Sequence, residues 1–235
     1  MLEVKDLNVF YGQIQVLRNV CLNVPSGKLV ALFGPNGHGK STLLKTICGL
    51  VPAASGTVIL EGQEIQNVPS DRLVPMGVVL ISEERHLFPE MSVLDNLRLG
   101  AYNKSARADA GANLELVLTM FPKLKALAKK PAETLSGGEA RMLAIGRGLM
   151  SNGSFLAIDE PSFGLSPALR TQVFEKISEL RDLGKSVLVV EQSTGDIAEM
   201  ADYIYLMEDG HIVFEGDSNA AFADEEFKKV FLGVI

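Results

Sequence analysis

The stretch Gly34-Pro35-Asn36-Gly37-His38-Gly39-Lys40-Ser41-Thr42 decides the fold of this chain. It fits the pattern G-x-x-x-x-G-K-[ST] of a phosphate-binding loop. The apolar run 29–33 before it predicts a buried strand, and residues 41–48 after it predict a helix that ends at Gly49. The glycines let consecutive backbone N–H groups point at phosphate oxygens, and the helix N-terminus adds its positive dipole end. Lys40 can then reach the β- and γ-phosphates, and Ser41 can bind Mg²⁺.

Composition predicts a soluble globular protein with a sizeable core. The chain has 235 residues, of which 47% are hydrophobic and 22% charged. Its net charge of −7 argues against a broad nucleic-acid-binding face. No apolar run approaches the roughly 20 residues of a membrane-spanning helix. Cys21 and Cys48 lie in apolar contexts, so we expect buried thiols rather than a disulfide or a metal pair.

The first sixty residues predict an antiparallel β layer around the strand, loop and helix of the phosphate site. Residues 2–10, 16–24 and 57–60 are apolar or alternating runs separated by turn residues. Tyr11 ends the first of these runs. Its ring could stack on a purine, or it could be a core tyrosine at the end of a strand, and the residue alone favours the second interpretation.

Three further apolar runs end in polar side chains that could form a site. Glu83 follows the run 77–81, Asp159 and Glu160 follow 155–158, and Glu191 and Gln192 follow 187–190. Ligands of parallel sheets bind at the carboxyl ends of the strands, although residues 82–86 could equally be a solvated loop. Of the two adjacent acids, one can bind Mg²⁺ opposite the phosphate loop and the next can hold and polarise an attacking water.

Residues 88–150 predict a helical insertion between strands of the core. Within it, Leu135-Ser136-Gly137-Gly138-Glu139 contains the pattern of a capping box, which is a purely structural interpretation. Two glycines inside a helix start are less expected, because glycine costs about 1 kcal/mol against alanine there. They would allow a close approach of something outside the helix, and the helix dipole favours an anion.

The remaining residues predict a helix, a hairpin and the C-terminal end. Residues 168–183 carry a helical apolar stripe, and 204–207 and 211–214 flank a hairpin turn containing Asp209-Gly210. Residues 217–235 predict one or two terminal helices.

The order of these motifs resembles the ATP-binding subunits of ABC transporters. The phosphate loop, the element Leu135–Glu139 and the strand ending in Asp159-Glu160 follow one another as in that family. Further stretches look like the LivF-type subunit of branched-chain amino acid (hydrophobic amino acid/amide) importers: Phe10-Tyr11-Gly12, Ile81-Ser82-Glu83, Met142–Arg147, Val190-Glu191-Gln192 and Phe231-Leu232-Gly233. The resemblance covers the whole chain.

This resemblance implies an α/β fold, a P-loop NTPase (RecA-like) core with an antiparallel β subdomain and an inserted helical subdomain. The core and β layer are expected at about 1–85 and 151–235, and the helical subdomain at about 86–150. Together they would form a single ATP-binding domain, 1–235.

The resemblance also implies ATP and Mg²⁺ as cofactors and assigns roles to individual residues. Tyr11 is expected to stack on the adenine of ATP. The phosphates are expected at the loop residues Gly34, Asn36, Gly37, Gly39, Lys40, Ser41 and Thr42. A third group would close on a nucleotide held by the opposite subunit: Ser136, Gly137, Gly138 and Glu139. Ser41, Glu83 and Asp159 are expected at Mg²⁺. Glu160 is the expected general base, with Lys40, Glu83 and Gln192 as further catalytic residues.

Two positions depart from the wider family, in which Gln is usual at Glu83 and His at Gln192. A carboxylate at Glu83 adds negative charge near the γ-phosphate. Gln192 can donate a hydrogen bond but cannot shuttle a proton, which favours Glu160 as the base. His38, inside the phosphate loop, is interpreted as a spacer.

The resemblance implies a subunit that hydrolyses ATP to power amino-acid uptake. Its expected partners are a sister ATPase subunit or a second copy in a head-to-tail dimer, two integral membrane subunits docked near residues 83–89, and, indirectly, an extracytoplasmic solute-binding protein. It would lie on the cytoplasmic face of the membrane and would not bind nucleic acid. The alternative is a soluble ABC ATPase without a transport role, such as a cluster-assembly partner. A regulatory module without catalysis is disfavoured by the intact Lys40, Asp159 and Glu160.

Overall fold

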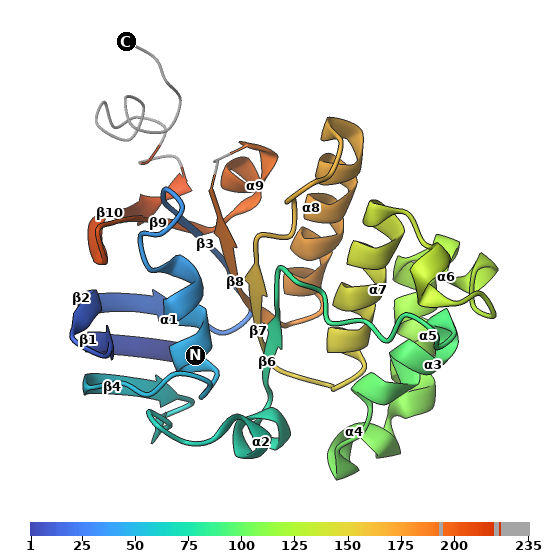
Figure 1. Ribbon diagram of the computed structural model, residues 1–235, viewed down its shortest axis with the longest axis horizontal. Coiled ribbons are helices and arrows are strands. Elements are labelled where there is room, and N and C mark those ends of the chain that lie inside the picture. The colour runs from blue at the N-terminus through green and yellow to red at the C-terminus, as the bar shows by residue number, and fades with distance from the viewer. Residues whose placement is uncertain (193–194, 219–220, 222–235) are drawn as a thin grey trace.

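Two β-sheets and the helices around them make up the computed structural model, which describes residues 1–192, 195–218 and 221 (Figure 1). The smaller sheet is antiparallel, in the order β2 (Ile14–Val24), β1 (Leu2–Tyr11), β4 (Ser55–Leu60) and β5 (Gln63–Glu64). The larger sheet has the order β10 (His211–Asp217), β9 (Tyr203–Glu208), β3 (Leu29–Phe33), β8 (Ser186–Glu191), β7 (Phe155–Asp159) and β6 (Val78–Ile81). Its strands β9 to β6 are parallel, and β10 pairs antiparallel to β9.

The larger sheet is covered on both faces, which explains why its strands are almost continuously apolar. Along β3, Val30 and Leu32 face a core shared with the smaller sheet and with helix α1 (Lys40–Ile47). Ala31 and Phe33 face the opposite core, which the remaining long helices cover. The two-residue alternation of a strand therefore builds two cores from one strand.

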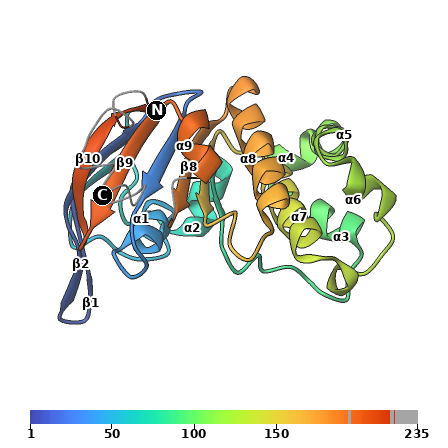
Figure 2. The same ribbon diagram turned by 90° about the horizontal axis from the view of Figure 1, so that it is seen from above.

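Helices gather on the side of the large sheet away from the antiparallel sheet (Figures 1 and 2). They are α3 (Val93–Gly100), α4 (Lys104–Ala108), α5 (Ala110–Met120), α6 (Pro122–Ala126), α7 (Gly137–Leu149), α8 (Pro167–Asp182) and α9 (Gly195–Met200), with a short 3₁₀ turn at Ala132–Thr134. Helix α2 (Ser70–Leu73) and the 3₁₀ turn Val74–Met76 lie on the other side, where Leu73 packs into the core shared with the smaller sheet. Residues 88–150, all of them described, contain helices and no strand, as expected. Pro122 stands at the start of the short helix α6, where a proline is tolerated, and separates α6 from α5.

The remaining expectations for single elements can now be compared with the structure. The hairpin around Asp209-Gly210 is confirmed as β9 and β10. Most of the predicted terminal helices, in 217–235, lie outside the described residues, and the division into one domain with a helical lobe stays a prediction. Within the described part of the chain, none of the helices combines the length and the apolar character needed to cross a membrane.

The prediction that both cysteines are buried is wrong for Cys21. The side chains of Val20 and Leu22 point into the core from β2, so strand alternation turns Cys21 outward to the surface. Its sulfur accepts a hydrogen bond from the Asp6 amide at 3.2 Å. Cys48 is buried as expected, and burial raises the pKa of its thiol to about 12.

Strand register gathers the polar strand ends at one edge of the large sheet. Phe33 of β3 lies beside Glu191 of β8, and Asp159 of β7 lies beside Val190 of β8. Ile81 of β6 pairs with Ile158 of β7. The residues that follow β3, β6, β7 and β8 therefore emerge together, beside the start of α1.

We predict that Gly34→Ala lowers the free energy of unfolding by about 1–3 kcal/mol through overpacking. A Cβ added to Gly34 would lie 2.3 Å from the carbonyl oxygen of Met207, a backbone atom that cannot turn aside. Gly111→Ala on the exposed side of α5 is the matched control, because nothing lies within 4 Å of its added Cβ. It should be neutral or stabilising by up to about 1 kcal/mol. Urea unfolding compares the variants, and equal losses in both would contradict the close approach.

Candidate functional site

The phosphate loop and the strand ends enclose one cavity of about 510 Å³. Its lining consists of Tyr11, Val16, Asn36, Gly37, Gly39, Lys40, Ser41, Thr42, Glu83, Glu160 and Phe163. The loop reaches helix α1 through Gly37 and Gly39, whose φ angles of 84° and 102° favour glycine. The predicted strand, loop and helix are therefore present, with the N-terminus of α1 at the cavity.

Lys40 is held inside this cavity rather than in solvent. Its Nζ donates a hydrogen bond to the Pro35 carbonyl at 3.0 Å and lies 3.7 Å from Oε1 of Glu160. Burial lowers the pKa of the Lys40 ammonium, and the negative charges of Glu160 and Asp159 oppose that shift. A cation confined in this way is placed to meet an anionic ligand such as a phosphate.

Ser41 lines the cavity, and Asp159 is its hydrogen-bond partner. The Ser41 hydroxyl donates a hydrogen bond of 3.0 Å to Oδ1 of Asp159. Burial raises the pKa of the Asp159 carboxyl, while this hydrogen bond acts in the opposite direction. One hydroxyl and one carboxylate are hard oxygen donors, and they fit Mg²⁺, which commonly takes its remaining ligands from water and phosphate. No cluster of three or more His, Cys, Asp or Glu side chains suited to a metal occurs among the described residues.

Glu160 directs its carboxylate toward Lys40 from an uncommon backbone conformation. Its φ is +42°, in the left-handed region, and its amide donates to the Val190 carbonyl at 2.9 Å. Burial raises the pKa of the Glu160 carboxyl, with the Lys40 charge opposing and the Glu83 and Asp159 charges adding to the rise. A carboxylate with a raised pKa is a better proton acceptor near neutral pH than an ordinary glutamate.

The other predicted site residues divide into those at the cavity and those away from it. Tyr11 is 48% exposed at the cavity mouth, and Glu83 contributes to the lining. Gly34 packs against the backbone of Met207, and this contact leaves no room for a side chain. Gln192 is exposed and is absent from the cavity lining given by the described residues, so its catalytic role stays a prediction.

The element Ser136–Glu139 lies at the start of α7, outside this cavity. The expected capping box is present: the Glu139 amide donates to Oγ of Ser136 at 3.4 Å, and the Ser136 amide donates to Oε2 of Glu139 at 2.9 Å. Packing explains why residue 138 is a glycine, because a Cβ added there would lie 2.9 Å from the side chain of Leu169. Gly137 is exposed, and its added Cβ would approach nothing nearer than an Arg85 nitrogen at 3.9 Å. Packing therefore explains Gly138 and leaves Gly137 free for a close approach from outside.

Comparison with known proteins agrees with this geometry. The model of the ABC transporter family matches residues 17–163, which include the phosphate loop, the element Ser136–Glu139 and Glu160. The chain belongs to the ABC transporter family. The expected ABC ATPase and its P-loop NTPase fold are thus confirmed.

Named relatives place the chain within this family. It is 39% identical to the high-affinity branched-chain amino acid transport ATP-binding protein BraG of Pseudomonas aeruginosa, over 99% of this chain and 100% of that protein. It is 35% identical to the probable branched-chain amino acid transport ATP-binding protein LivF of Archaeoglobus fulgidus, over 100% of both. A solved relative is the dimeric post-hydrolysis state of the ATP-binding cassette MJ0796 bound to ADP and Pi, with a TM-score of 0.78, 25% identity and coverage of 93% of this chain and 99% of that one. The resemblance to LivF-type ABC subunits is therefore confirmed.

Sequence reasoning missed three contacts around this ABC ATP site. Glu191 is buried at the end of β8, and its two carboxylate oxygens accept hydrogen bonds from the Ser162 amide and hydroxyl, each at 2.9 Å. Phe163 lines the cavity. His38 accepts a hydrogen bond from the Asp209 amide at 2.8 Å, so it ties the phosphate loop to the β9–β10 turn. Of these three features, only the contact of Glu191 had a signal in the sequence, namely its position at the end of an apolar run.

We predict a pH-dependent stability that depends on Glu191. Burial raises the pKa of the Glu191 carboxyl from 4.5 to about 7 despite the hydrogen bonds from Ser162. Because the folded protein holds this proton more tightly than the unfolded chain, the stabilisation is complete below about pH 4.5 and is lost as the pH rises through about 7. The loss should amount to about 3 kcal/mol.

Glu191→Gln isolates this effect, because an amide of the same shape does not titrate. The free energy of unfolding of both proteins is measured from about pH 4.5 to 8 by urea titration. The wild-type protein should lose stability relative to the variant across this range. Parallel curves for the two proteins would contradict the assignment.

Proposed function

We propose that this chain hydrolyses ATP to power the uptake of branched-chain or related hydrophobic amino acids or amides through separate membrane subunits. The observation that carries the proposal is the cavity in which Lys40, the Ser41–Asp159 pair and Glu160 converge on the phosphate loop. The relatives BraG and LivF, whose names specify branched-chain amino acid transport, support the choice of solute.

The residues of the cavity can share the steps of ATP hydrolysis. The loop amides and Lys40 would hold the phosphates, and Tyr11 at the mouth would contact the adenine. Ser41 and Asp159, with Glu83 nearby, would hold Mg²⁺, which neutralises phosphate charge. Glu160 would accept the proton of the attacking water, and the raised pKa of its carboxyl suits that task.

The element Ser136–Glu139 would complete the ATP site of a second subunit. In one chain it lies outside the cavity, and its exposed Gly137 leaves room for a phosphate to approach the start of α7. Two subunits arranged head to tail would then share two ATP sites, each built from the phosphate loop of one and the Ser136–Glu139 element of the other. The dimeric structure of the related cassette supports pairing with another copy or with a sister subunit.

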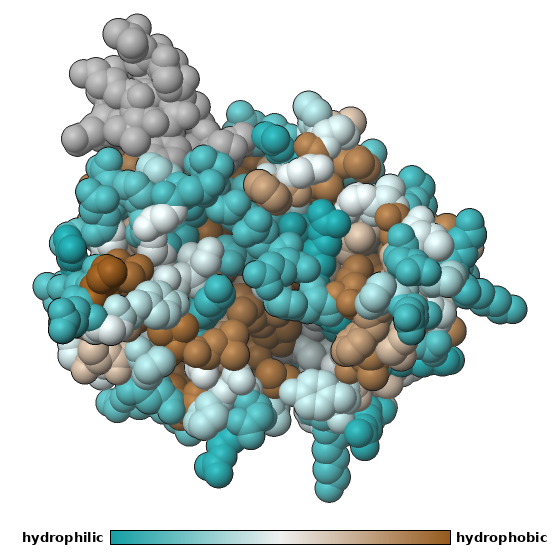
Figure 3. Space-filling model, in the orientation of Figure 1, coloured by the Kyte–Doolittle hydropathy of each residue, from teal (hydrophilic) through white to brown (hydrophobic). Residues whose placement is uncertain are grey.

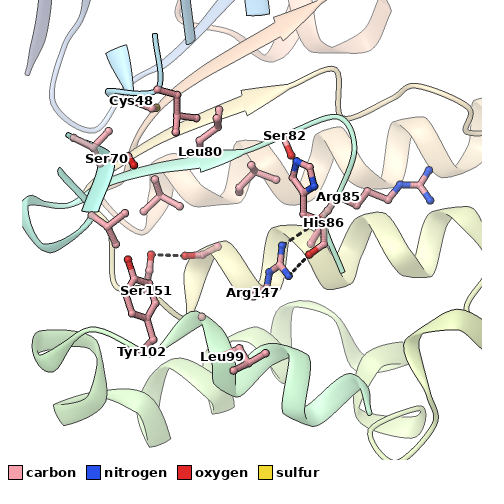
Figure 4. A pocket seen from close by; sticks show the side chains of 18 of the residues that line it. Cys48, Ser70, Leu80, Ser82, Arg85, His86, Leu99, Tyr102, Arg147 and Ser151 are labelled. Atoms are coloured by element: carbon pink, nitrogen blue, oxygen red, sulfur yellow. Dashed lines mark hydrogen bonds between the residues drawn. The ribbon is translucent and has the colours of Figure 1, made fainter. Parts of the chain in front are cut away.

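A second hollow would receive the membrane subunits. It has a volume of about 470 Å³ and lies between β6 and helices α3 and α7 (Figure 4). Figure 3 shows apolar surface in this hollow, between the strands and the helical side of the molecule. Its lining includes residues 79–82, Phe88, Leu99 and Tyr102. Docking there would place this chain on the cytoplasmic face of the membrane, with a solute-binding protein acting from the other side.

Co-purification from detergent-solubilised membranes tests this proposal. The full chain should recover integral membrane proteins, and the purified assembly should take up the solute when supplied with ATP. Phe88→Asp, at a side chain 49% exposed in the hollow, should reduce the recovery. Leu183→Asp, at a side chain 43% exposed after α8, should not. Recovery of soluble proteins alone would favour the alternative of a soluble ABC ATPase in cluster assembly.

A further inference from the structure

An arginine is fully buried between the start of α7 and the loop that carries Glu83. Arg141 has 0% exposure and lies two residues beyond Glu139. Its Nη1 donates a hydrogen bond of 3.2 Å to the Ser82 carbonyl, and Ser82 directly precedes Glu83. Its Nε and Nη2 are buried without a hydrogen-bond partner among the described residues. A buried guanidinium left half unsatisfied is costly, so its presence calls for a physical reason.

Charge supplies that reason. Glu191, Glu83 and Asp159 attract Arg141 electrostatically, while Arg85 repels it. Burial, with the Arg85 repulsion, lowers the pKa of the Arg141 guanidinium to about 10, which leaves it charged at neutral pH. Arg141 is therefore a buried cation behind a site rich in carboxylates.

Glu83 is one of three interacting acids at this site. Its charge adds to the rise in pKa of both the Asp159 and the Glu160 carboxyls, which shows that the three acids act on one another. Asp159 is hydrogen-bonded to Ser41, and Glu160 lies near Lys40. Arg141 is the cation whose charge interacts with Glu83 from the protein side of the cavity.

The loop itself is attached to α7 by a different arginine. Arg147 donates to the carbonyls of His86 at 2.6 Å and Arg85 at 2.8 Å, as the dashed lines in Figure 4 show. Arg85 and His86 have φ angles of 63° and 45°, an uncommon left-handed pair that these bonds hold in place. Loss of Arg141 would thus leave the loop on α7 and remove mainly a positive charge.

We infer that Arg141 is a positioning residue for Glu83: its buried charge orients the Glu83 carboxylate in the ATP site and links that carboxylate to the helix that begins with Ser136–Glu139. This inference rests on the proposed ATP site. Through Arg141, one chain would connect the acid in its own ATP site to the helix start that completes the site of its partner. The wider family usually has Gln where this chain has Glu83. A carboxylate at this position calls for a counter-charge, whereas a neutral Gln would not.

A double-mutant cycle on the purified full-length protein tests the inference. Arg141→Gln keeps a donor for the Ser82 carbonyl and removes the charge. It should lower kcat for ATP hydrolysis about tenfold and change KM for ATP less than about twofold. Glu83→Gln removes the acid that Arg141 serves. In the Glu83→Gln background, Arg141→Gln should change kcat less than about twofold. Arg141→Lys keeps the charge and should restore kcat to within about threefold of wild type.

Two results would overturn the inference: an unchanged kcat in Arg141→Gln, or the same fold loss in both backgrounds. If Arg141→Gln does not fold, Arg141→Met replaces it in the cycle, because an apolar side chain of similar length leaves no buried unpaired donor. Wild-type protein and Lys40→Ala are assayed in parallel. Hydrolysis that is present in the first and absent in the second confirms the ATP site, so failure of the cycle then counts against Arg141 alone.

Discussion

Replacing Glu160 with Gln is expected to lower kcat for ATP hydrolysis by about 10²–10⁴-fold, the range typical of a lost general base. The amide keeps the size of the side chain but cannot accept the proton of water. Binding of ATP should be retained or strengthened, because removing a carboxylate 3.7 Å from Lys40 takes negative charge away from the phosphate site. The variant should therefore hold ATP in a closed dimer that wild-type protein forms only transiently.

Steady-state hydrolysis and size-exclusion chromatography in Mg-ATP measure the two effects of Glu160→Gln. Glu84→Gln is the matched control, because this exposed acid follows Glu83 but does not line the cavity. It should keep kcat within about twofold of wild type, as a surface residue outside the site would. Normal turnover by the Glu160 variant would remove this residue from the role of base.

Replacing Lys40 with Ala is expected to weaken ATP binding by about 10–100-fold, the equivalent of a hydrogen bond to a charged group. Hydrolysis should fall to background. The loss combines two effects, since the phosphates lose a buried cation and Glu160 and Asp159 lose a charge that opposes the rise in their pKa. Binding of a fluorescent ATP analogue and phosphate release measure the two losses separately.

Lys104→Ala provides the control for Lys40, because Lys104 is exposed on α4 and outside the cavity lining. Its loss should leave ATP affinity within about twofold of wild type. Full activity of the Lys40→Ala variant would contradict the claim that this loop binds the phosphates of ATP.

The candidate site was largely predictable because it lies where strands end. A glycine loop before a helix and acids after apolar runs can be read from a chain, and parallel strands bring such ends to one edge. The 3.0 Å contact between Ser41 and Asp159 joins residues 118 positions apart, and it follows from that rule. The exposure of Cys21 could also have been predicted from the inward-facing Val20 and Leu22 on either side of it.

Other features depend on packing that a linear pattern does not contain. The raised pKa of Glu191 requires the burial of its carboxyl group in the folded protein. The nitrogens of Arg141 that lack a hydrogen-bond partner are buried because α7 packs against β6. The four-residue helix α2 is too short to show a helical period. Gln192 was placed at the site by resemblance, whereas the described structure leaves its side chain exposed.

The central claim is that the two halves of an ATP site come from two different chains. The phosphate loop of one chain faces the Ser136–Glu139 element of the other, so a dimer contains two shared sites. A complementation assay tests it by mixing Lys40→Ala chains with Gly137→Asp chains. The second change puts a negative charge at the exposed helix start, where the added side chain has room. Each variant alone should be inactive. A 1:1 mixture should regain about a quarter of the wild-type hydrolysis rate, because half of the dimers are mixed and each mixed dimer has one intact site. A mixture no faster than its separate components would contradict the shared site.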